Sequence, residues 1–336
     1  MNVIRKSKRA TLRDVARHAQ VSVATVSRVL NKSELVSTDT RNRVNQAIDV
    51  LEFVPSAAAR SLSSGRSRAI GALVPTLDHA IFARYLDTLE DQLSGHGYAL
   101  IVAVTGGVAE VEERKVHNLL DMGIEGLIVS GKRHTKGFAA CVERFAVPTL
   151  ITSYYDPDAQ YPTIGYDNSA IAQAALAHLK SLGHHSIAVV HGPTDVNDRI
   201  AARIAAIEEA AGEAQVRFVP VSMRVEGGAD AVARMVEQGP LPSAILCLSD
   251  VQALGALFEL QRRNITVPDE VSLMGFDDLE WSAVSFPGIT SIQLPAAEMG
   301  SVASDAIVDW LRTGNRATPK RLEAHIVERG STRALG

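Results

Sequence analysis

The stretch from Thr11 to Asn31, TLRDVARHAQVSVATVSRVLN, constrains the fold of this chain more than any other. Its first half carries apolar residues at i, i+3, i+4 and i+7, which are Leu12, Val15, Ala16 and Ala19. Its second half carries a shorter apolar stripe of Val26, Val29 and Leu30. Only the segment 18–21 separates the two patterns, so the two helices must meet at a steep angle. This arrangement predicts a helix-turn-helix whose second helix lies in a DNA major groove, with an ordinary helical hairpin as the alternative.

Polar residues at the starts of the two helices and on the outer face of the second agree with this prediction. Thr11 and Ser22 stand where hydroxyl oxygens cap free backbone N–H groups. The outer face of the second helix is small or rich in donors, and Arg28 can offer two N–H donors to a guanine. The candidate DNA-contacting residues here are Thr11, Ser22, Val23, Ala24, Thr25, Ser27, Arg28 and Asn31.

Charge is distributed unevenly along the 336 residues. The whole chain has a formal net charge of −4, which by itself argues against binding to nucleic acid. Residues 1–68, however, carry 13 Lys and Arg against 5 Asp and Glu, a net charge of +8, and the remainder carries 21 against 33, a net charge of −12. A basic N-terminal part on an acidic body places a phosphate-binding surface at one end.

Composition and length indicate a soluble chain of two or three domains, with 46% hydrophobic and 21% charged residues. No apolar run is long enough to cross a bilayer, and no apolar signal core follows the basic N-terminus. We therefore expect a cytoplasmic protein without a membrane partner. Cys141 and Cys247 lie in apolar surroundings, which favours buried free thiols over a disulfide or a metal site.

Three segments with different patterns follow one another along the chain. A third helical pattern after Ser37 and Thr38 completes a headpiece over residues 1–54. Residues 55–66 begin with PSAAARSL, where proline and three alanines favour a helix, but so short a helix is marginal alone and a plain linker is the alternative. Residues 67–336 form the remaining core.

The core alternates continuous apolar strands with helices. The expected strands of a first unit are 69–75, 98–104, 126–130 and 147–152, and those of a second are 187–190, 216–219, 244–248 and 271–276. Continuous apolar strands separated by helices indicate an α/β fold with two doubly wound parallel sheets. Ligands in such sheets bind at the carboxyl ends of the strands, which here would face a cleft between the two units.

The residues of several segments, taken together, resemble one family. VSVATVSRVLN preceded by TLRDVARHA is similar to the headpiece of the LacI/GalR family of bacterial transcriptional regulators, and the core adds Leu182-Gly183-His184, VPDEVS at 267–272, GFDD at 275–278 and RGST at 329–332. One departure is Gln20, where the family usually has a glycine in the turn. If that turn needs a left-handed residue, Gln20 costs on the order of 1 kcal/mol.

The resemblance implies a ligand-responsive regulator, most often a repressor, that binds a palindromic operator as a homodimer. It implies a periplasmic-binding-protein-like core with an N-subdomain of residues 67–165 and 296–329 and a C-subdomain of residues 166–292. It also aligns PSAAARSL with a hinge helix that orders on DNA. By that match Leu62 enters the minor groove and Ala59 packs closely beside it.

The expected effector, a sugar or sugar derivative, binds in the cleft. Asp250 and Asp277 follow strands and Arg199 opens a helix; carboxylates and a guanidinium suit hydroxyl groups, although both aspartates could instead cap the helices after them. The resemblance adds Thr76, Asp78, Phe82 and Ser249. The pattern departs from sugar-binding members at Ala202, Arg203, Met223 and Leu294, so a sugar acid or a non-carbohydrate metabolite also fits.

Other functional classes fit the sequence less well. The pair His184-His185 on a tight turn has no carboxylate or cysteine at ligand spacing, so no metal or other cofactor is expected. No phosphate-binding glycine loop and no nucleophile motif is present, which argues against a sugar-processing enzyme. A solute-binding protein of a transport system would share the two-unit core. The basic headpiece counts against that alternative.

Overall fold

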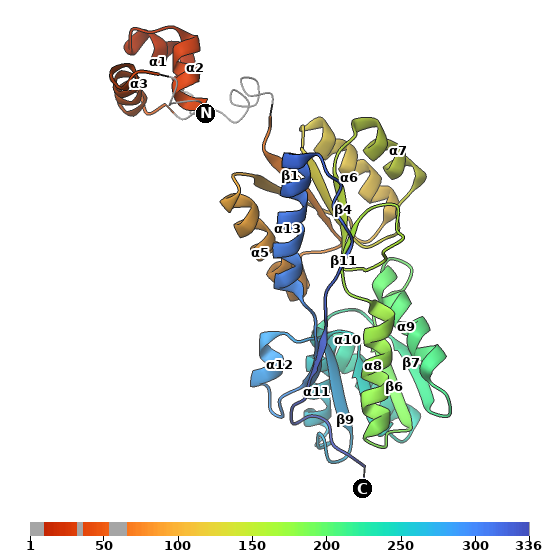
Figure 1. Ribbon diagram of the computed structural model, residues 1–336. Coiled ribbons are helices and arrows are strands. Elements are labelled where there is room, and N and C mark those ends of the chain that lie inside the picture. The colour runs from red at the N-terminus through yellow and green to blue at the C-terminus, as the bar shows by residue number, and fades with distance from the viewer. Residues whose placement is uncertain (1–9, 32–35, 54–65, 336) are drawn as a thin grey trace, which may run out of the picture. The chain divides into compact units, whose positions relative to one another are not determined.

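The computed structural model describes residues 10–31, 36–53 and 66–335. Two compact units are formed by Met1–Arg68, the headpiece, and Ala69–Gly336, the core (Figure 1). The predicted combination of a helix-turn-helix domain with a periplasmic-binding-protein-like α/β core is confirmed. In the described part of the chain, no helix combines the length and the apolar character needed to span a membrane.

The headpiece consists of the helices α1 (Leu12–His18), α2 (Val23–Asn31) and α3 (Thr38–Val50) around one small core. A capping box begins α1, since the Thr11 hydroxyl oxygen accepts the Asp14 N–H at 3.4 Å and the Thr11 N–H donates to Asp14 Oδ2 at 2.9 Å. Ser22 begins α2 by accepting the Thr25 N–H at 3.0 Å, as predicted. Val15, Val26 and Val44, one from each helix, are fully buried where the helices meet.

The turn between α1 and α2 is left-handed at Gln20, which has a φ of 52°. Only glycine adopts such a φ without a penalty from its Cβ atom. The guanidinium of Arg43, on α3, donates to the carbonyl oxygens of Ala19 at 2.9 Å and Gln20 at 3.3 Å. Arg43 follows these two residues by 24 and 23 positions, so its hydrogen bonds tie the strained turn to α3.

Replacing Gln20 with glycine should therefore stabilise the headpiece by about 0.5–1 kcal/mol, because the strain disappears. Hydrogen exchange of the α1–α3 amides in the full-length protein would measure the change. The control is Ala19→Gly at the neighbouring residue, whose φ of −78° is ordinary and which should lose stability instead. A loss of stability in both variants would contradict the proposed strain.

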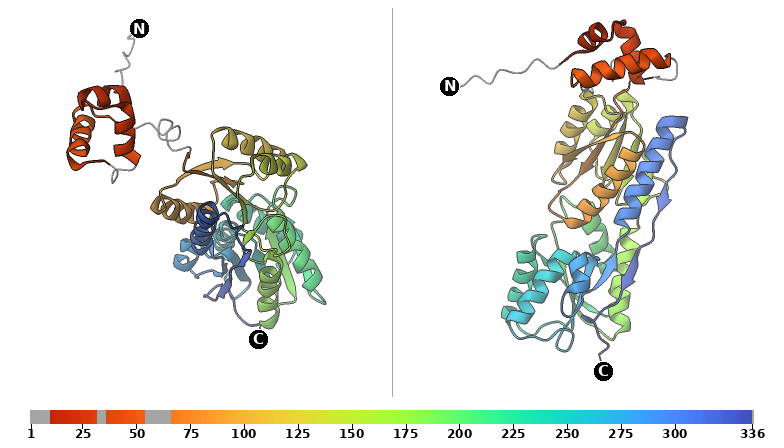
Figure 2. Two further views of the ribbon diagram at one scale, coloured as in Figure 1. Left: turned by 45° about the horizontal axis from the view of Figure 1, so that its top comes forward. Right: turned by 90° about the vertical axis from the view of Figure 1, so that its left-hand side faces the viewer.

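The first subdomain of the core is a six-stranded parallel sheet in the order β11-β5-β4-β3-β1-β2. Helices α5 and α13 cover one face side by side, and α6 and α7 cover the other (Figures 1 and 2). The elements are β1 (Ala69–Val74), α5 (Ala80–Gly95), β2 (Ala99–Val104), α6 (Ala109–Asp121), β3 (Gly126–Ser130), α7 (Lys136–Phe145), β4 (Thr149–Thr152), β5 (Thr163–Gly165), α13 (Ala296–Thr313) and β11 (Lys320–Arg321).

The second subdomain repeats this plan with the order β12-β10-β9-β8-β6-β7, in which only β12 is antiparallel. Helix pairs α8/α9 and α10/α11 cover its two faces. The elements are α8 (Asn168–Ser181), β6 (Ser186–His191), α9 (Asp198–Ala210), β7 (Gln215–Pro220), α10 (Val225–Gln238), β8 (Ala244–Cys247), α11 (Asp250–Arg262), β9 (Ser272–Asp277), α12 (Glu280–Val284), β10 (Thr290–Gln293) and β12 (His325–Val327).

Within residues 66–335 the chain crosses between the subdomains three times, after β5, after β10 and after β11. The return of residues 296–311 to the first subdomain agrees with the expectation. The assignment of residues 296–329 to that subdomain is wrong at its end. Since β12 pairs with β10, residues 325–327 complete the second sheet.

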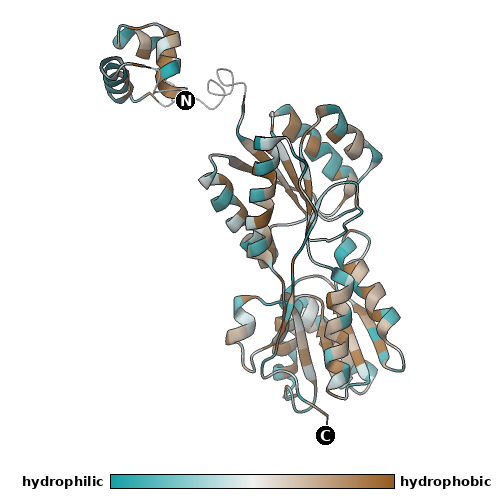
Figure 3. Ribbon diagram, in the orientation of Figure 1, coloured by the Kyte–Doolittle hydropathy of each residue, from teal (hydrophilic) through white to brown (hydrophobic). Residues whose placement is uncertain are grey.

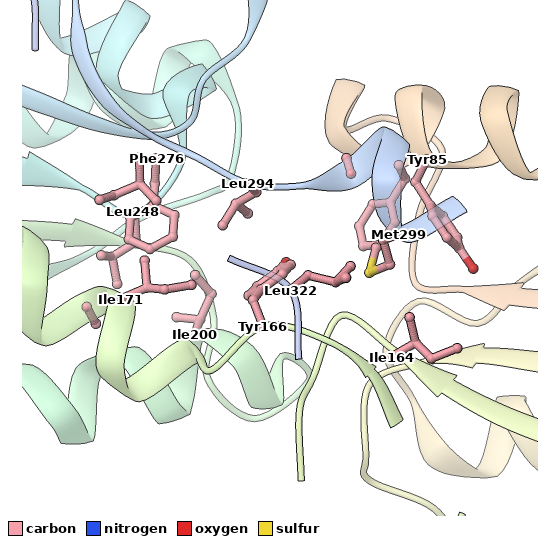
Figure 4. Packing of buried hydrophobic residues seen from close by; sticks show 14 of the residues in the cluster. Tyr85, Ile164, Tyr166, Ile171, Ile200, Leu248, Phe276, Leu294, Met299 and Leu322 are labelled. Atoms are coloured by element: carbon pink, nitrogen blue, oxygen red, sulfur yellow. The ribbon is translucent and has the colours of Figure 1, made fainter. Parts of the chain in front are cut away.

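The hydrophobic core follows the layers of each subdomain. Strand residues are predominantly hydrophobic, whereas the helices are hydrophobic on one side only (Figure 3). One cluster of buried residues continues from the α5/α13 side of the first sheet to the α8/α9 side of the second. Figure 4 shows Tyr85 and Met299 at one end of it and Leu248 and Phe276 at the other. The two subdomains therefore share apolar packing beside the cleft.

Candidate DNA-binding surface and effector cleft

The outer face of α2 remains exposed after the headpiece has formed its core. Ser22, Val23, Ala24 and Arg28 are exposed, while Val26 and Val29 of the same helix are buried. Small residues beside one arginine allow the helix to approach base edges closely, and the guanidinium can pair with a guanine. The amphipathic division predicted from the sequence is therefore present, and the contacts of this face with DNA stay a prediction.

The remaining predicted DNA-binding residues differ in exposure, and some of them lie outside the described residues. Thr25 and Ser27 are half-buried on α2, and Thr11 is exposed but uses its hydroxyl in the α1 capping box. Asn31 ends α2, and its side chain is not among those described. Ala59 and Leu62 lie outside the described residues, as does nearly all of the predicted hinge at 55–66.

Between the subdomains, at the carboxyl ends of the strands, lies a cleft with a small inner cavity and a wide mouth. The inner cavity measures about 40 Å³ and the mouth about 860 Å³. His79, Phe82, Asn197 and Met223 line both. A small group can thus enter the inner cavity while the rest of a molecule occupies the mouth.

Of the predicted effector residues, Phe82, Arg199 and Asp277 line the inner cavity, and Thr76, Asp78 and Phe82 line the mouth. Asp78 also faces Arg224 of the other subdomain, with 3.6 Å between Oδ2 and Nη2. Both side chains of this ion pair are largely exposed, so it contributes little to stability. It lies across the mouth of the cleft, where a ligand would meet it.

Arg199 reaches the cavity because α9 begins directly at the cleft. Asn197 caps the helix by accepting the Ile200 N–H at 3.2 Å. The Arg199 guanidinium is buried and lies 3.1 Å from Asp198 Oδ1, and it also faces the ring of Phe82 at 6.0 Å. Asp198 in turn accepts the backbone N–H of Lys132 from the first subdomain at 2.5 Å.

Arg203 is a cavity residue that the sequence reasoning missed. It follows Arg199 by one helical turn, so both project from the same face of α9. Its Nε donates to Asn168 Oδ1 at 3.0 Å, its Nη1 to the Leu248 carbonyl at 3.3 Å, and its guanidinium lies 4.0 Å from the centroid of the Phe276 ring. The i, i+4 spacing to Arg199 was the signal that would have identified it.

Asp277 ends β9 with a φ of 114° and faces the inner cavity. Its Oδ2 accepts a hydrogen bond from the Ser249 hydroxyl at 3.2 Å. Burial, reinforced by the nearby Asp250 carboxylate, raises the pKa of Asp277 to about 8, although Arg203 acts in the opposite direction. Asp277 is therefore mostly protonated at pH 7 and can donate a hydrogen bond.

The predicted role of Asp250 in effector binding needs correction, because this side chain does not line the inner cavity. It is fully buried, and both its oxygens are occupied: Oδ2 accepts from Leu279 N at 2.8 Å and from Ser282 Oγ at 2.6 Å, and Oδ1 accepts from Ser291 Oγ at 2.7 Å. It ties β10 and the segment after β9 to the start of α11. Ser249 does not line the cavity either; it caps α11 and holds Asp277.

No group of three or more metal-binding side chains is found within the described ranges. His184 instead forms structural contacts, with 3.1 Å from Nδ1 to Ser243 Oγ and 3.1 Å from Nε2 to the Arg333 carbonyl oxygen. A helix-turn-helix headpiece joined to a core with a polar inter-subdomain cleft defines a DNA-binding regulator that responds to a small molecule.

Comparisons with known proteins agree with that class. Residues 11–56 match the bacterial regulatory proteins of the lacI family, and residues 176–332 match the periplasmic binding protein-like domain. The HTH-type transcriptional repressor PurR of Vibrio atlanticus is 31% identical over 336 residues, covering 97% of this chain and 99% of that protein. The repressor CytR of Escherichia coli K12 is 28% identical, with 97% of each chain covered. The chain belongs to the lacI family of bacterial regulatory proteins.

Solved structures show the same architecture. The lac repressor dimer bound to operator and the anti-inducer ONPF superposes with a TM-score of 0.86 at 25% identity, covering 97% of this chain and 100% of that one. The regulator CelR in complex with cellobiose gives a TM-score of 0.67 at 26% identity, with 96% and 100% covered. These relatives are regulators, in agreement with the prediction of a regulator and not an enzyme.

Proposed function

We propose that this regulator is a repressor that binds a palindromic operator as a homodimer and is controlled by a small metabolite in the cleft. The observation that carries the proposal is the presence, in one chain, of the exposed α2 face with Arg28 and of the Arg199–Asp277 cavity. The names of the relatives PurR and CytR support a repressor. Relatives in complex with ONPF, ribose and cellobiose support a sugar-like effector.

An exposed apolar patch on the second subdomain supports the homodimer. Val284 is 83% exposed and Phe286 88%, and Phe258 on α11 is half exposed. The Phe286 carbonyl accepts a hydrogen bond from the Gln261 side chain of α11 at 2.7 Å, which places the segment after α12 beside the helix that carries Phe258. Apolar patches of this kind usually mark a protein interface. A second copy of the chain is the proposed occupant, and the lac repressor structure is a dimer.

Effector binding would change operator affinity by shifting the equilibrium between two arrangements of the subdomains. A ligand shifts such an equilibrium by no more than its differential affinity for the two arrangements. The Asp78–Arg224 pair and the Lys132–Asp198 hydrogen bond join the subdomains across the cleft, so a change in the arrangement of the subdomains would alter these contacts. Whether the effector releases or strengthens operator binding depends on which arrangement it favours.

Selection from random duplexes tests the proposed function. The full-length protein should enrich an inverted repeat, because a dimer presents two copies of α2. Arg28→Ala should cost roughly 1–3 kcal/mol of discrimination between the selected site and a variant altered at one base pair, measured by competition at fixed salt. Arg234→Ala, on the exposed face of α10, serves as the control. A single asymmetric site, or no enrichment at all, would contradict the proposal.

A further inference from the structure

Arg199 and Arg203 concentrate positive charge in the inner cavity. Both are buried, at 7% and 4% exposure, and both line the same space of about 40 Å³. Arg199 is balanced by Asp198 at 3.1 Å. Arg203 donates to the neutral oxygens of Asn168 and Leu248, is hydrogen-bonded to Tyr166 and lies near the buried Asp277 carboxyl, although no carboxylate of the described residues lies within ion-pair distance of it. Because burial favours the neutral form of Asp277, the Arg203 guanidinium has no fully charged partner at pH 7, and an anion would stabilise this site.

The shape of the cleft fits an acid with a larger polar body. A cavity of about 40 Å³ has room for roughly three waters, which is comparable to one carboxylate group. The adjoining mouth of about 860 Å³ is lined by the donors and acceptors of Thr76, Asn197 and Ser222. The planar fork of an arginine matches the two oxygens of a carboxylate.

Resting on the proposed function, we propose that the effector is a small hydroxylated organic acid whose carboxylate binds Arg203 and Arg199 in the inner cavity. Its hydroxylated body then occupies the mouth of the cleft. Arg203 is a specificity-determining residue in this arrangement, because it distinguishes the acid from the neutral sugar with the same carbon skeleton.

Asp277 supports this assignment through its protonation state. Facing it are Arg203 and Arg199 on α9, Asp250 on α11, and Tyr166, which follows β5, while the Ser249 hydroxyl donates to it. With a pKa raised to about 8, the neutral Asp277 donates a hydrogen bond to a ligand carboxylate below that pH. Above it, the ionised side chain repels the ligand. An acid should therefore bind about tenfold more weakly at pH 9 than at pH 7.

The test compares matched ligands by thermal shift and calorimetry on the full-length protein. Each pair consists of an aldonic acid and the aldose with the same skeleton, such as D-gluconate with D-glucose and D-galactonate with D-galactose; D-glucose 6-phosphate tests a phosphate in place of the carboxylate. We expect acids to raise the melting temperature and the aldoses to leave it unchanged. The proposal would be overturned if the aldoses stabilised the protein or if none of the acids did. It would also be overturned if D-glucose 6-phosphate stabilised the protein and the acids did not.

The variant Arg203→Phe removes the charge and keeps a flat side chain of similar size beside Phe276. We expect it to bind the acids at least tenfold more weakly than the parent, with Arg203→Lys intermediate because it keeps the charge and loses the fork. The control Arg217→Phe changes an exposed arginine of β7 and should bind them like the parent. Unchanged acid binding in both Arg203 variants would overturn the proposal.

The change of affinity with pH should have opposite signs for acids and for neutral polyols, the competing class of ligand. A neutral polyol would donate its hydroxyls to an ionised Asp277 and would bind more tightly as the pH rises through 8. Operator binding is measured in parallel. If an aldose releases the operator, the protein is still a regulator and only the proposal of an acid effector is wrong. If the protein binds no operator, the proposed function is wrong, whatever binds in the cleft.

Discussion

Replacing Asp250 with alanine is expected to lower the free energy of unfolding of the core by about 3–5 kcal/mol, because the buried donors of Leu279, Ser282 and Ser291 lose their acceptor. Urea unfolding of the full-length protein, followed by intrinsic fluorescence, measures the change. The matched control Asp269→Ala removes an exposed carboxylate 3.1 Å from Arg333 and should change stability by less than about 1 kcal/mol.

The same variant distinguishes the two interpretations of Asp250. A structural carboxylate predicts a large loss of stability, with ligand binding preserved in the fraction that is folded. A protein that keeps the parental stability and loses only its response to the effector would show that Asp250 contacts the ligand after all.

Replacing Arg199 with alanine should weaken effector binding at least 100-fold, or about 2.7 kcal/mol, and leave operator affinity within about twofold. The side chain lines the inner cavity, and its removal takes away one of the two guanidinium groups there and leaves the Asp198 carboxylate without its ion-pair partner. Calorimetry with the compound that gives the largest thermal shift measures the first effect, and operator titration without ligand the second.

The control for Arg199→Ala is Arg234→Ala, on the exposed face of α10, which should change neither effector binding nor operator affinity. Parental effector affinity in Arg199→Ala would mean that the cavity beside Phe82 and Asp277 is not where the effector binds.

Local patterns predicted most of the fold. The helices of the headpiece and the alternating strands and helices of the core have periodic apolar stripes, which a sequence shows directly. Strands β5, β10, β11 and β12 have two to four residues each and exist because neighbouring strands pair with them. Their pairing depends on distant segments, so the position of residues 325–327 was missed.

The cleft was predictable only in part, because the sequence cannot show which way a side chain points at the end of a strand. Asp250 and Asp277 both follow an apolar strand, yet Asp277 faces the cavity and Asp250 is enclosed by Leu279, Ser282 and Ser291. Arg203 was noted as a departure from the family pattern, but its role depends on where α9 lies relative to Phe276 and Leu248.

The three crossings between the subdomains have a mechanical consequence. The crossing after β11 starts beside the crossing after β5, where Leu322 N donates to the Gly165 carbonyl at 2.7 Å. It ends beside the crossing that leaves β10, because β12 pairs with that strand. Three connections that lie side by side can bend together, and they oppose twisting and sliding of one subdomain against the other. We therefore expect the subdomains to move relative to one another mainly by bending about these three connections, and a ligand in the cleft to act on that bending.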